Sequence, residues 1–417
     1  MSIENLKESR YRPPNLLSIF VMSSEAKSKP VATPALTFKT STFGNIFYWS
    51  LILLTAPSWA SAITYQTYDY HLLVTLIIGI IAFFLSVFAI PRCRNTHIRS
   101  RLFGRDLNKG EDPETAVQVP ETMGLESSAI MIACVIIIAA FSEVRNILYP
   151  AIISISLTTF LGFADDVLNI PWRVKIFIPF FSVLPLVLNY DGSTTIYFHG
   201  FLSPIKSLFN VEYIDVGIFY YLYIFCLFVF CTHSINIYAG INGLEAGQSL
   251  IVACFLLFHS ICYWGSEPGS KAAAILLIPF IATTYGLLYF NWFPSRVFVG
   301  DTFTLTAGAV IASAGVLGHF AEMTLLFMLP QLINFAVSLP QLIGFIPCPR
   351  HRLPVLNKKT GKLEGKTINW NLVNLWLLIF GPKTEERLCI ELLIFQIICC
   401  LAAFGVRYLY NTDIFGV

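Results

Sequence analysis

Charged residues are scarce in this chain. Asp, Glu, Lys and Arg make up 12% of its 417 residues, whereas 56% are hydrophobic and the mean hydropathy is +0.68. A soluble domain typically carries roughly 25% charged residues, so the composition excludes a soluble globule of this length. It predicts a polytopic membrane protein instead.

The chain also lacks the cysteine and histidine spacings of common zinc sites and disulfide frameworks. Its ten cysteines include no C-x-x-C pair, and its seven histidines form no H-x-x-x-H pattern. Cys348 and His351 lie close together, but a structural zinc site there would need two further ligands, which the neighbouring sequence does not offer. The cysteines are therefore interpreted as small apolar packing residues.

Apolar runs are long and numerous. A helix needs about 20 residues to cross the roughly 30 Å hydrocarbon core of a bilayer. The predicted fold is therefore all-α, with about ten transmembrane helices. The predicted spans are 71–91, 126–142, 147–164, 174–190, 216–238, 249–264, 272–290, 303–320, 324–346 and 389–410.

Residues 1–70 are predicted to be an N-terminal extension of a membrane domain that comprises residues 71–417. Residues 1–44 are rich in Ser, Pro, Lys and Arg, a composition that predicts disorder. The apolar stretch Ile46 to Ile63 is short for a span, and Pro57 interrupts it. It is an eleventh span, an interfacial segment or a cleaved signal, and the sequence leaves these alternatives open.

Four polar clusters interrupt the apolar runs, and the predicted spans place all four on one side of the membrane. Lys and Arg accumulate on the cytoplasmic side of membrane proteins. Between residues 92 and 407, the loops on the side of the clusters hold 17 of these residues, against 4 on the opposite side. The active site is therefore predicted to be formed by cytosolic loops. The clusters are Phe163 to Asp166, Asn236 to Glu245, Arg296 to Asp301 and Arg350 to Arg352.

The first cluster contains two adjacent carboxylates, Asp165 and Asp166. Adjacent carboxylates repel each other, and at a membrane edge this favours a bound cation. Lys175 follows within ten residues of the pair. The alternative is that one of the two aspartates caps a helix while Asn169 and Pro171 form a turn.

The other clusters supply amide and cationic groups. Asn236 and Asn242 lie among three glycines, which allow the backbone to approach a ligand, although Asn-Gly pairs are also ordinary turns. Asp301 opens a span, either as a ligand or as a helix N-cap. The loop Arg350 to Arg352 carries guanidinium groups that match phosphate oxygens, or it is a solvated cytosolic loop.

Together, the clusters predict a phosphoryl transfer at the membrane surface. Mg²⁺ prefers oxygen ligands and usually bridges phosphates, and the basic loop suits a diphosphate. A transporter is a different class of protein that also keeps ionisable residues in its spans, but it predicts polar residues near the midplane. A catalytically inactive scaffold is a third possibility.

Four motifs of the chain resemble those of the polyprenyl-phosphate N-acetylhexosamine-1-phosphate transferases. They are LGFADDVLNIPWRVK, INIYAGINGLEAGQS, FNWFPSRVFVGDTF and IPCPRHRLP. They occur in family order, and the resemblance extends over about residues 71 to 417. Bacterial relatives typically have a His-rich motif where this chain has Pro349 to Arg352, which favours the dolichol branch and a GlcNAc donor.

The resemblance implies transfer of GlcNAc-1-phosphate from UDP-GlcNAc to dolichyl phosphate, giving GlcNAc-diphosphodolichol and UMP. This would be the first step of lipid-linked oligosaccharide synthesis for N-glycosylation. The resemblance further implies ten transmembrane helices in the endoplasmic reticulum membrane, a cytosol-facing site, Mg²⁺ and inhibition by tunicamycin. The expected partners besides the substrates are membrane lipid and a second copy of the chain, without a role for nucleic acid. A relative that uses another UDP-sugar or polyprenyl phosphate is the alternative.

The resemblance also implies roles for individual residues. Asp165, Asp166 and Lys175 would be catalytic. A phosphate monoester has a second pKa near about 6, so a base would contribute little at neutral pH. The two aspartates are therefore predicted to act as much by orienting Lys175 and the metal-bound waters as by accepting a proton. The remaining roles are Asn236 and Asp301 for the metal; Lys175 and Arg350 for the diphosphate; His351 and Arg352 for GlcNAc; Arg105, Asp106, Leu107, Glu121 and Asn242 for uridine; and Trp172, Phe230, Cys231, Thr232, His233, Ser234, Ile235, Asn236 and Ile237 for the lipid phosphate.

Two features depart from the family pattern. The first 70 residues are longer than the segment that usually precedes the first span, and the loop between residues 347 and 388 is shorter than in vertebrate relatives. The first difference bears on targeting, and the second on the cover over the sugar.

Overall fold

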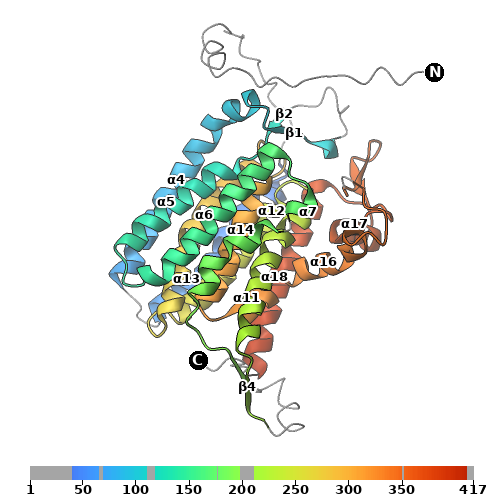
Figure 1. Cartoon of the computed structure of the whole chain (residues 1–417). Coiled ribbons are helices and arrows are strands. Elements are labelled where there is room, and N and C mark those ends of the chain that lie inside the picture. Colours follow the sequence, from blue (N-terminus) through green and yellow to red (C-terminus); the bar gives the residue numbers. More distant parts are fainter. Residues whose placement is uncertain are drawn as a thin grey trace, which may run out of the picture. The chain divides into compact units, whose positions relative to one another are not determined.

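The computed structural model describes residues 40–64, 69–109, 118–175, 177–197, 211–349 and 352–410, all within one compact unit, Lys39–Val417. Helices dominate this unit (Figure 1), which confirms the all-α polytopic prediction. The long helices are α4 (Tyr70–Arg99), α5 (Gly124–Ala140), α6 (Arg145–Leu168), α11 (Ile218–Ile237), α12 (Leu244–Cys262), α13 (Pro268–Asn291), α14 (Gly300–Leu317) and α18 (Glu385–Tyr410).

Eight segments of the described chain are long and apolar enough to cross a membrane. A ninth is added if α15 (Ala321–Phe327) and α16 (Leu329–Leu342), which are bent by 68°, form one broken span. The eight include Thr42–Ile63, which comprises α2 (Thr42–Ser50), the 3-10 turn η1 (Leu51–Thr55) and most of α3 (Ala56–Thr64). Pro57 lies in the first turn of α3, where its missing N–H is not needed. Among the three alternatives for Ile46 to Ile63, this geometry favours a further span.

The predicted span 174–190 is wrong as a single helix. This part of the chain forms three short helices, α7 (Trp172–Lys175), α8 (Ile178–Ser182) and α9 (Leu184–Leu188). Pro179 and Pro185 lie in the first turns of α8 and α9. Proline has no N–H to donate and clashes with the preceding turn, so each proline begins a new helix instead of continuing the old one.

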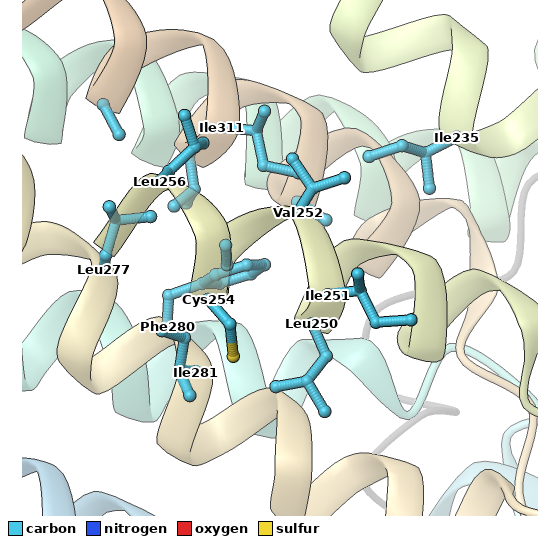
Figure 2. Close-up of a cluster of buried hydrophobic side chains, with 14 of the residues drawn as sticks. Ile235, Leu250, Ile251, Val252, Cys254, Leu256, Leu277, Phe280, Ile281 and Ile311 are labelled. Carbon is cyan, nitrogen blue, oxygen red and sulfur yellow. The ribbon is translucent and has the colours of Figure 1, made fainter. Parts of the chain in front are cut away.

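The buried centre of the bundle comprises α12, α13 and α14. In the 18-residue apolar stretch of each helix, 83%, 89% and 89% of the residues are buried. Figure 2 shows side chains of α12, such as Val252 and Leu256, packed with Leu277 and Phe280 of α13 and Ile311 of α14. By contrast, only 28% of the corresponding apolar stretch of α4 is buried, so this helix exposes an apolar surface that suits lipid.

Short antiparallel strand pairs lie outside the long helices. The pair β1 (Phe103–Arg105) and β2 (Gln118–Pro120) lies at the same end of the helices as α7, whereas β4 (Tyr213–Asp215), which pairs with β3 (Thr195–Tyr197), lies at the opposite end (Figure 1). A third pair, β5 (Val355–Asn357) and β6 (Lys362–Glu364), precedes α17 (Leu372–Phe380). The end marked by α7 and β1–β2 carries the candidate site.

Candidate active site

Asp301, in the first turn of α14, is the centre of the site. Its carboxylate accepts hydrogen bonds from the side-chain amide of Asn236, at the end of α11, and from the ammonium group of Lys175 in α7. The Asn236 amide also donates to Thr304 Oγ1 over 3.1 Å. Three elements far apart in the sequence thus place the two predicted metal ligands and the predicted catalytic lysine in direct contact.

Asp166, at the end of α6, caps the N-terminus of α14. Its carboxylate accepts the backbone N–H of Asp301 at 2.7 Å, the backbone N–H of Thr302 at 3.0 Å and the Thr302 hydroxyl at 2.6 Å. The N-cap residue Val299 provides no side-chain hydrogen bond. Asp166 therefore satisfies otherwise orphaned donors of another helix, and it positions Asp301 through the backbone.

Gly300 makes this close approach possible. Its φ is +73°, and a Cβ atom there would lie 2.6 Å from Asp166 Oδ2 and 2.7 Å from the backbone of Thr122. Both the conformation and the lack of space require glycine. The cap hypothesis for the first cluster is thus right for Asp166, but the capped helix begins 134 residues later in the chain.

Asp165 holds Lys175. Its Oδ2 lies 2.5 Å from Lys175 Nζ, and its Oδ1 accepts the backbone N–H of Ile170 over 3.0 Å. Asn169 ends α6 in the left-handed conformation, with φ +51°, as predicted for a turn residue. Burial lowers the pKa of Lys175, but Asp301 and Asp165 outweigh the burial and raise it above its ordinary value. Lys175 is therefore an ammonium at neutral pH.

The residues around Asp301 fit a Mg²⁺ ion. Asp301 and Asn236 offer hard oxygen donors, and Mg²⁺ is usually held by one or two carboxylates together with substrate phosphates. Rotating the Asn236 amide by half a turn brings its oxygen to the place of the nitrogen. Within the described part of the chain, no group of three His, Cys, Asp or Glu residues could hold a metal. A cage made only of such side chains is therefore absent from that part, and a substrate would have to complete the coordination.

The predicted uridine residues Asp106 and Asn242 lie together. Asn242 donates its side-chain amide to Asp106 Oδ2 over 3.0 Å and accepts the backbone N–H of Ser295 at Oδ1 over 2.8 Å. Its own backbone N–H donates to Glu385 Oε1 over 2.9 Å, and Asn108 Nδ2 reaches the same oxygen over 3.2 Å. Asn242 therefore joins its own loop to the loops that carry Asp106 and Ser295 and to the start of α18. Arg105 and Leu107 flank Asp106 at the end of β1 and the start of the next turn.

Glu385, Asn108 and Ser295 were missed by sequence reasoning. Glu385 and Glu386 form a second pair of adjacent carboxylates at the start of a span, on the same side as the four clusters. That pattern was the available signal for Glu385. Asn108 and Ser295 act through contacts between distant loops and have no local signature.

Glu121 lies between the β1–β2 pair and the carboxylates of the site. It directly follows β2, and its backbone carbonyl accepts a hydrogen bond from His97 Nδ1 over 2.8 Å. Burial, together with the negative charges of Asp166 and Asp301, raises the pKa of Glu121 to about 7. This carboxyl group therefore titrates near neutral pH.

The fourth cluster is only partly described. Arg350 and His351 lie outside the described residues. The Arg352 guanidinium donates to the carbonyl of Trp370 over 3.2 Å, and burial lowers its pKa. Leu353 lies against Gly240, where a Cβ atom would come within 2.6 Å of Leu353 Cδ2. Leu353, which follows Arg352, thus adjoins the loop that carries Asn242.

The predicted lipid-phosphate residues on α11 divide into two faces. Cys231, Thr232, Ser234 and Ile235 are buried among the helices, and a Cβ atom at Gly308 of α14 would lie 2.3 Å from the Cys231 carbonyl oxygen. The partly exposed face, which is the one open to a ligand, comprises Phe230, His233, Asn236 and Ile237. The side chain of Trp172 lies outside the described part of the structure.

Comparisons with known proteins show what the chain is similar to. A model of glycosyl transferase family 4 matches residues 148–319, which extend from the first turn of α6 to just beyond α14. The chain is also similar to several proteins named UDP-N-acetylglucosamine–dolichyl-phosphate N-acetylglucosaminephosphotransferase. One from Dictyostelium discoideum is 42% identical over 76% of this chain and 85% of its own length. Those from Schizosaccharomyces pombe and Saccharomyces cerevisiae are 36% and 31% identical, over 71% and 81% of this chain and 73% and 91% of their own lengths. The chain therefore belongs to the UDP-N-acetylglucosamine–dolichyl-phosphate N-acetylglucosaminephosphotransferase family.

Proposed function

We propose that this chain transfers GlcNAc-1-phosphate from UDP-GlcNAc to dolichyl phosphate, with UMP as the second product. The observation that supports this most directly is the convergence of Lys175, Asn236 and Asp301 at one end of the bundle. The names of the relatives support the choice of both substrates. The proposal places the enzyme as a homodimer in the endoplasmic reticulum membrane, with its site facing the cytosol.

In the proposed reaction, an oxygen of the dolichyl phosphate attacks the β-phosphorus of UDP-GlcNAc. The bond between this phosphorus and the bridging oxygen breaks, and UMP leaves with that oxygen and the electron pair. Lys175, already held beside Asp301, neutralises charge on the transferring group. Asp301 and Asn236 would hold Mg²⁺, which supplies further positive charge at the diphosphate.

Asp165 acts in this proposal mainly by orienting Lys175. The acceptor phosphate is already largely ionised at neutral pH, because its second pKa is near about 6. A base therefore contributes little, whereas an ion pair at 2.5 Å fixes the lysine before the substrates arrive. On the nucleotide side, Asp106, Glu121 and Asn242 would meet the uridine, and the basic loop that includes Arg352 would meet the sugar.

The test is an assay of the purified full-length protein with labelled UDP-GlcNAc and dolichyl phosphate. We expect a labelled lipid product that disappears with a Mg²⁺ chelator, with tunicamycin or with Asp301→Ala. Asp215→Asn, at the opposite end of the bundle, is the matched control and should retain activity. A monodisperse protein that makes no such product, or that prefers another UDP-sugar or a bacterial polyprenyl phosphate, would refute the assignment.

A further inference from the structure

The segment Thr42–Ile63 packs on the bundle through one face. Its buried residues are spaced by three, four or seven positions, as expected for one side of a helix. The opposite side exposes large apolar residues, including Ile46 at 62% and Leu53 at 65% exposure. The buried residues are Gly44, Tyr48, Leu51, Ser58 and Ala62.

Two tyrosines fix the height of this segment against α13. The hydroxyl of Tyr48 donates to the Tyr285 carbonyl over 3.3 Å, and the hydroxyl of Tyr285 donates to the Tyr48 carbonyl over 3.2 Å. The two rings stack with their centroids 4.9 Å apart. This reciprocal pair determines which residues of α2 meet the loops at the end of the bundle.

The start of α2 contacts the carboxylate of Glu386. This residue adjoins the loops that carry Asp106, Asn242 and Ser295, which are called the nucleotide-side loops below. The backbone N–H of Ser41 donates to Glu386 Oε1 over 3.2 Å, and a Cβ atom at Gly44 would lie only 1.9 Å from the same oxygen. The preceding residue, Glu385, accepts the N–H of Asn242. Glu386 is therefore joined by one peptide bond to Glu385, which is hydrogen-bonded to Asn242.

A second contact of α2, made by Phe47, reaches the same loops. The ring of Phe47 stacks on that of Trp292, with centroids 6.0 Å apart and planes inclined by 23°. Trp292 lies against Gly243, where a Cβ atom would be 3.0 Å from Trp292 Cε3. Gly243 follows Asn242, and Ser295, which Asn242 binds, follows Trp292 by three residues.

We infer that Thr42–Ile63 is an additional span that positions the nucleotide-side loops, so that Gly44 and Phe47 act as positioning residues for the UDP-sugar. The inference rests on the proposed function. One contact of α2 is with Glu386, which directly follows Glu385, and the other is with Trp292, which lies against Gly243 next to Asn242. Lys175 and Asp301 are instead held by α6, α7 and α11. Loss of the contacts should therefore affect donor binding more than the chemical step.

The test compares Phe47→Ala and Gly44→Ala with Ile46→Ala, which lies on the exposed face of the same helix. Stacked aromatic pairs contribute about 0.5–1.5 kcal/mol, which corresponds to roughly a twofold to tenfold change in an equilibrium constant. We expect Phe47→Ala to raise the KM for UDP-GlcNAc by about that factor, with kcat and the KM for dolichyl phosphate unchanged. Gly44→Ala should act in the same direction, because it displaces the flexible end of Glu386. Ile46→Ala should have the kinetic constants of the wild type, and Phe47→Tyr, which keeps the aromatic ring, should have the donor KM of the wild type.

Equilibrium binding of labelled UDP-GlcNAc separates this inference from the proposed function. If the wild type binds the donor and Phe47→Ala binds it equally well, the inference is wrong, whatever the outcome of the transfer assay. A rise of both KM values together with a lower melting temperature would also overturn it, since that result indicates a merely structural role. If the wild type forms no lipid product but Phe47→Ala still weakens donor binding, the proposed function fails and the inference on positioning survives for a UDP-sugar site.

Discussion

Lys175 lies between two carboxylates, Asp165 and Asp301, that come from different helices. A charged lysine that is partly buried loses hydration, and only paired charges compensate for this loss. The arrangement therefore keeps the ammonium in place before any phosphate is bound. An incoming diphosphate can take over part of the interaction with Lys175, because phosphate oxygens offer the same negative charge.

Replacing Asp165 with Asn should reduce kcat without changing its pH profile. The variant keeps the shape of the side chain but loses the charge that orients Lys175, and loss of such a supporting partner typically costs about 10-fold to 100-fold in activity. The measurement is kcat between pH 6.5 and 9. Recovery of activity in mild alkali would instead identify Asp165 as a base for the lipid phosphate.

Glu121 should make the stability of the protein depend on pH. Its pKa is raised from 4.5 to about 7 in the folded protein, so the folded state binds more protons than the unfolded state between these values. The free energy of unfolding should then fall as pH rises from about 4.5 to 7 and level off above that. In Glu121→Gln this contribution, on the order of 1–3 kcal/mol, should be absent. Melting temperatures without Mg²⁺ at pH 5.5 and 8.5 provide the measurement. An equal pH dependence in both proteins would contradict the prediction.

At the scale of elements, α14 depends on two neighbouring helices. Asp166 of α6 caps its first turn, and its Gly308 lies directly against the backbone of α11. Small residues allow membrane helices to approach closely, and packing then replaces the hydrophobic effect as the source of stability. The same contact holds Asn236, at the end of α11, beside Asp301 at the start of α14.

Gly308→Ala should therefore destabilise the bundle. Its added Cβ atom would lie 2.3 Å from the Cys231 carbonyl oxygen and 2.4 Å from Thr232 Cα, both of which belong to the backbone and cannot rotate away. Such overpacking typically costs about 1–3 kcal/mol. Gly405→Ala, in α18, is the control, because its Cβ atom would have no heavy atom within 4 Å. Thermal unfolding in detergent should show a lower midpoint for Gly308→Ala only.

At the scale of the whole molecule, the ends of the bundle differ in charge and in chemistry. The end with α7 and β1–β2 carries the site residues, whereas β4 marks the other end (Figure 1). Lys and Arg are concentrated in the loops on the side of the site. Because these residues favour the cytoplasmic side, the two ends should differ in access from the cytosol.

Cysteine labelling in sealed microsomes tests this orientation. In a background without Cys226 and Cys348, the exposed cysteines of the described chain, Lys359→Cys should react with a membrane-impermeant maleimide. Ser193→Cys, which is also exposed but lies next to β3, should react only after detergent is added. The opposite labelling pattern would place the site on the luminal side.

Local patterns account for much of the fold. Hydropathy located the long helices because membrane spans are recognised from contiguous residues, and Asn169 was recognisable as a turn residue. The span 174–190 was wrong because Pro179 and Pro185 divide a run whose average hydropathy is high. For Asp166, the local sequence allowed two roles, a ligand for a cation or a helix cap. Which distant N–H groups lie within hydrogen-bond distance could be seen only in the folded structure.

The amino-acid sequence by itself determined that the chain is a membrane protein, where most of its long helices lie and which four polar clusters are candidates for the site. These properties follow from contiguous residues and their transfer energies. Only the tertiary structure decided that Asp166 caps α14, that Lys175 bridges Asp165 and Asp301, and that α2 adjoins the loops around Asn242. Such pairings join residues up to 345 positions apart, and they depend on how the helices pack rather than on any local pattern.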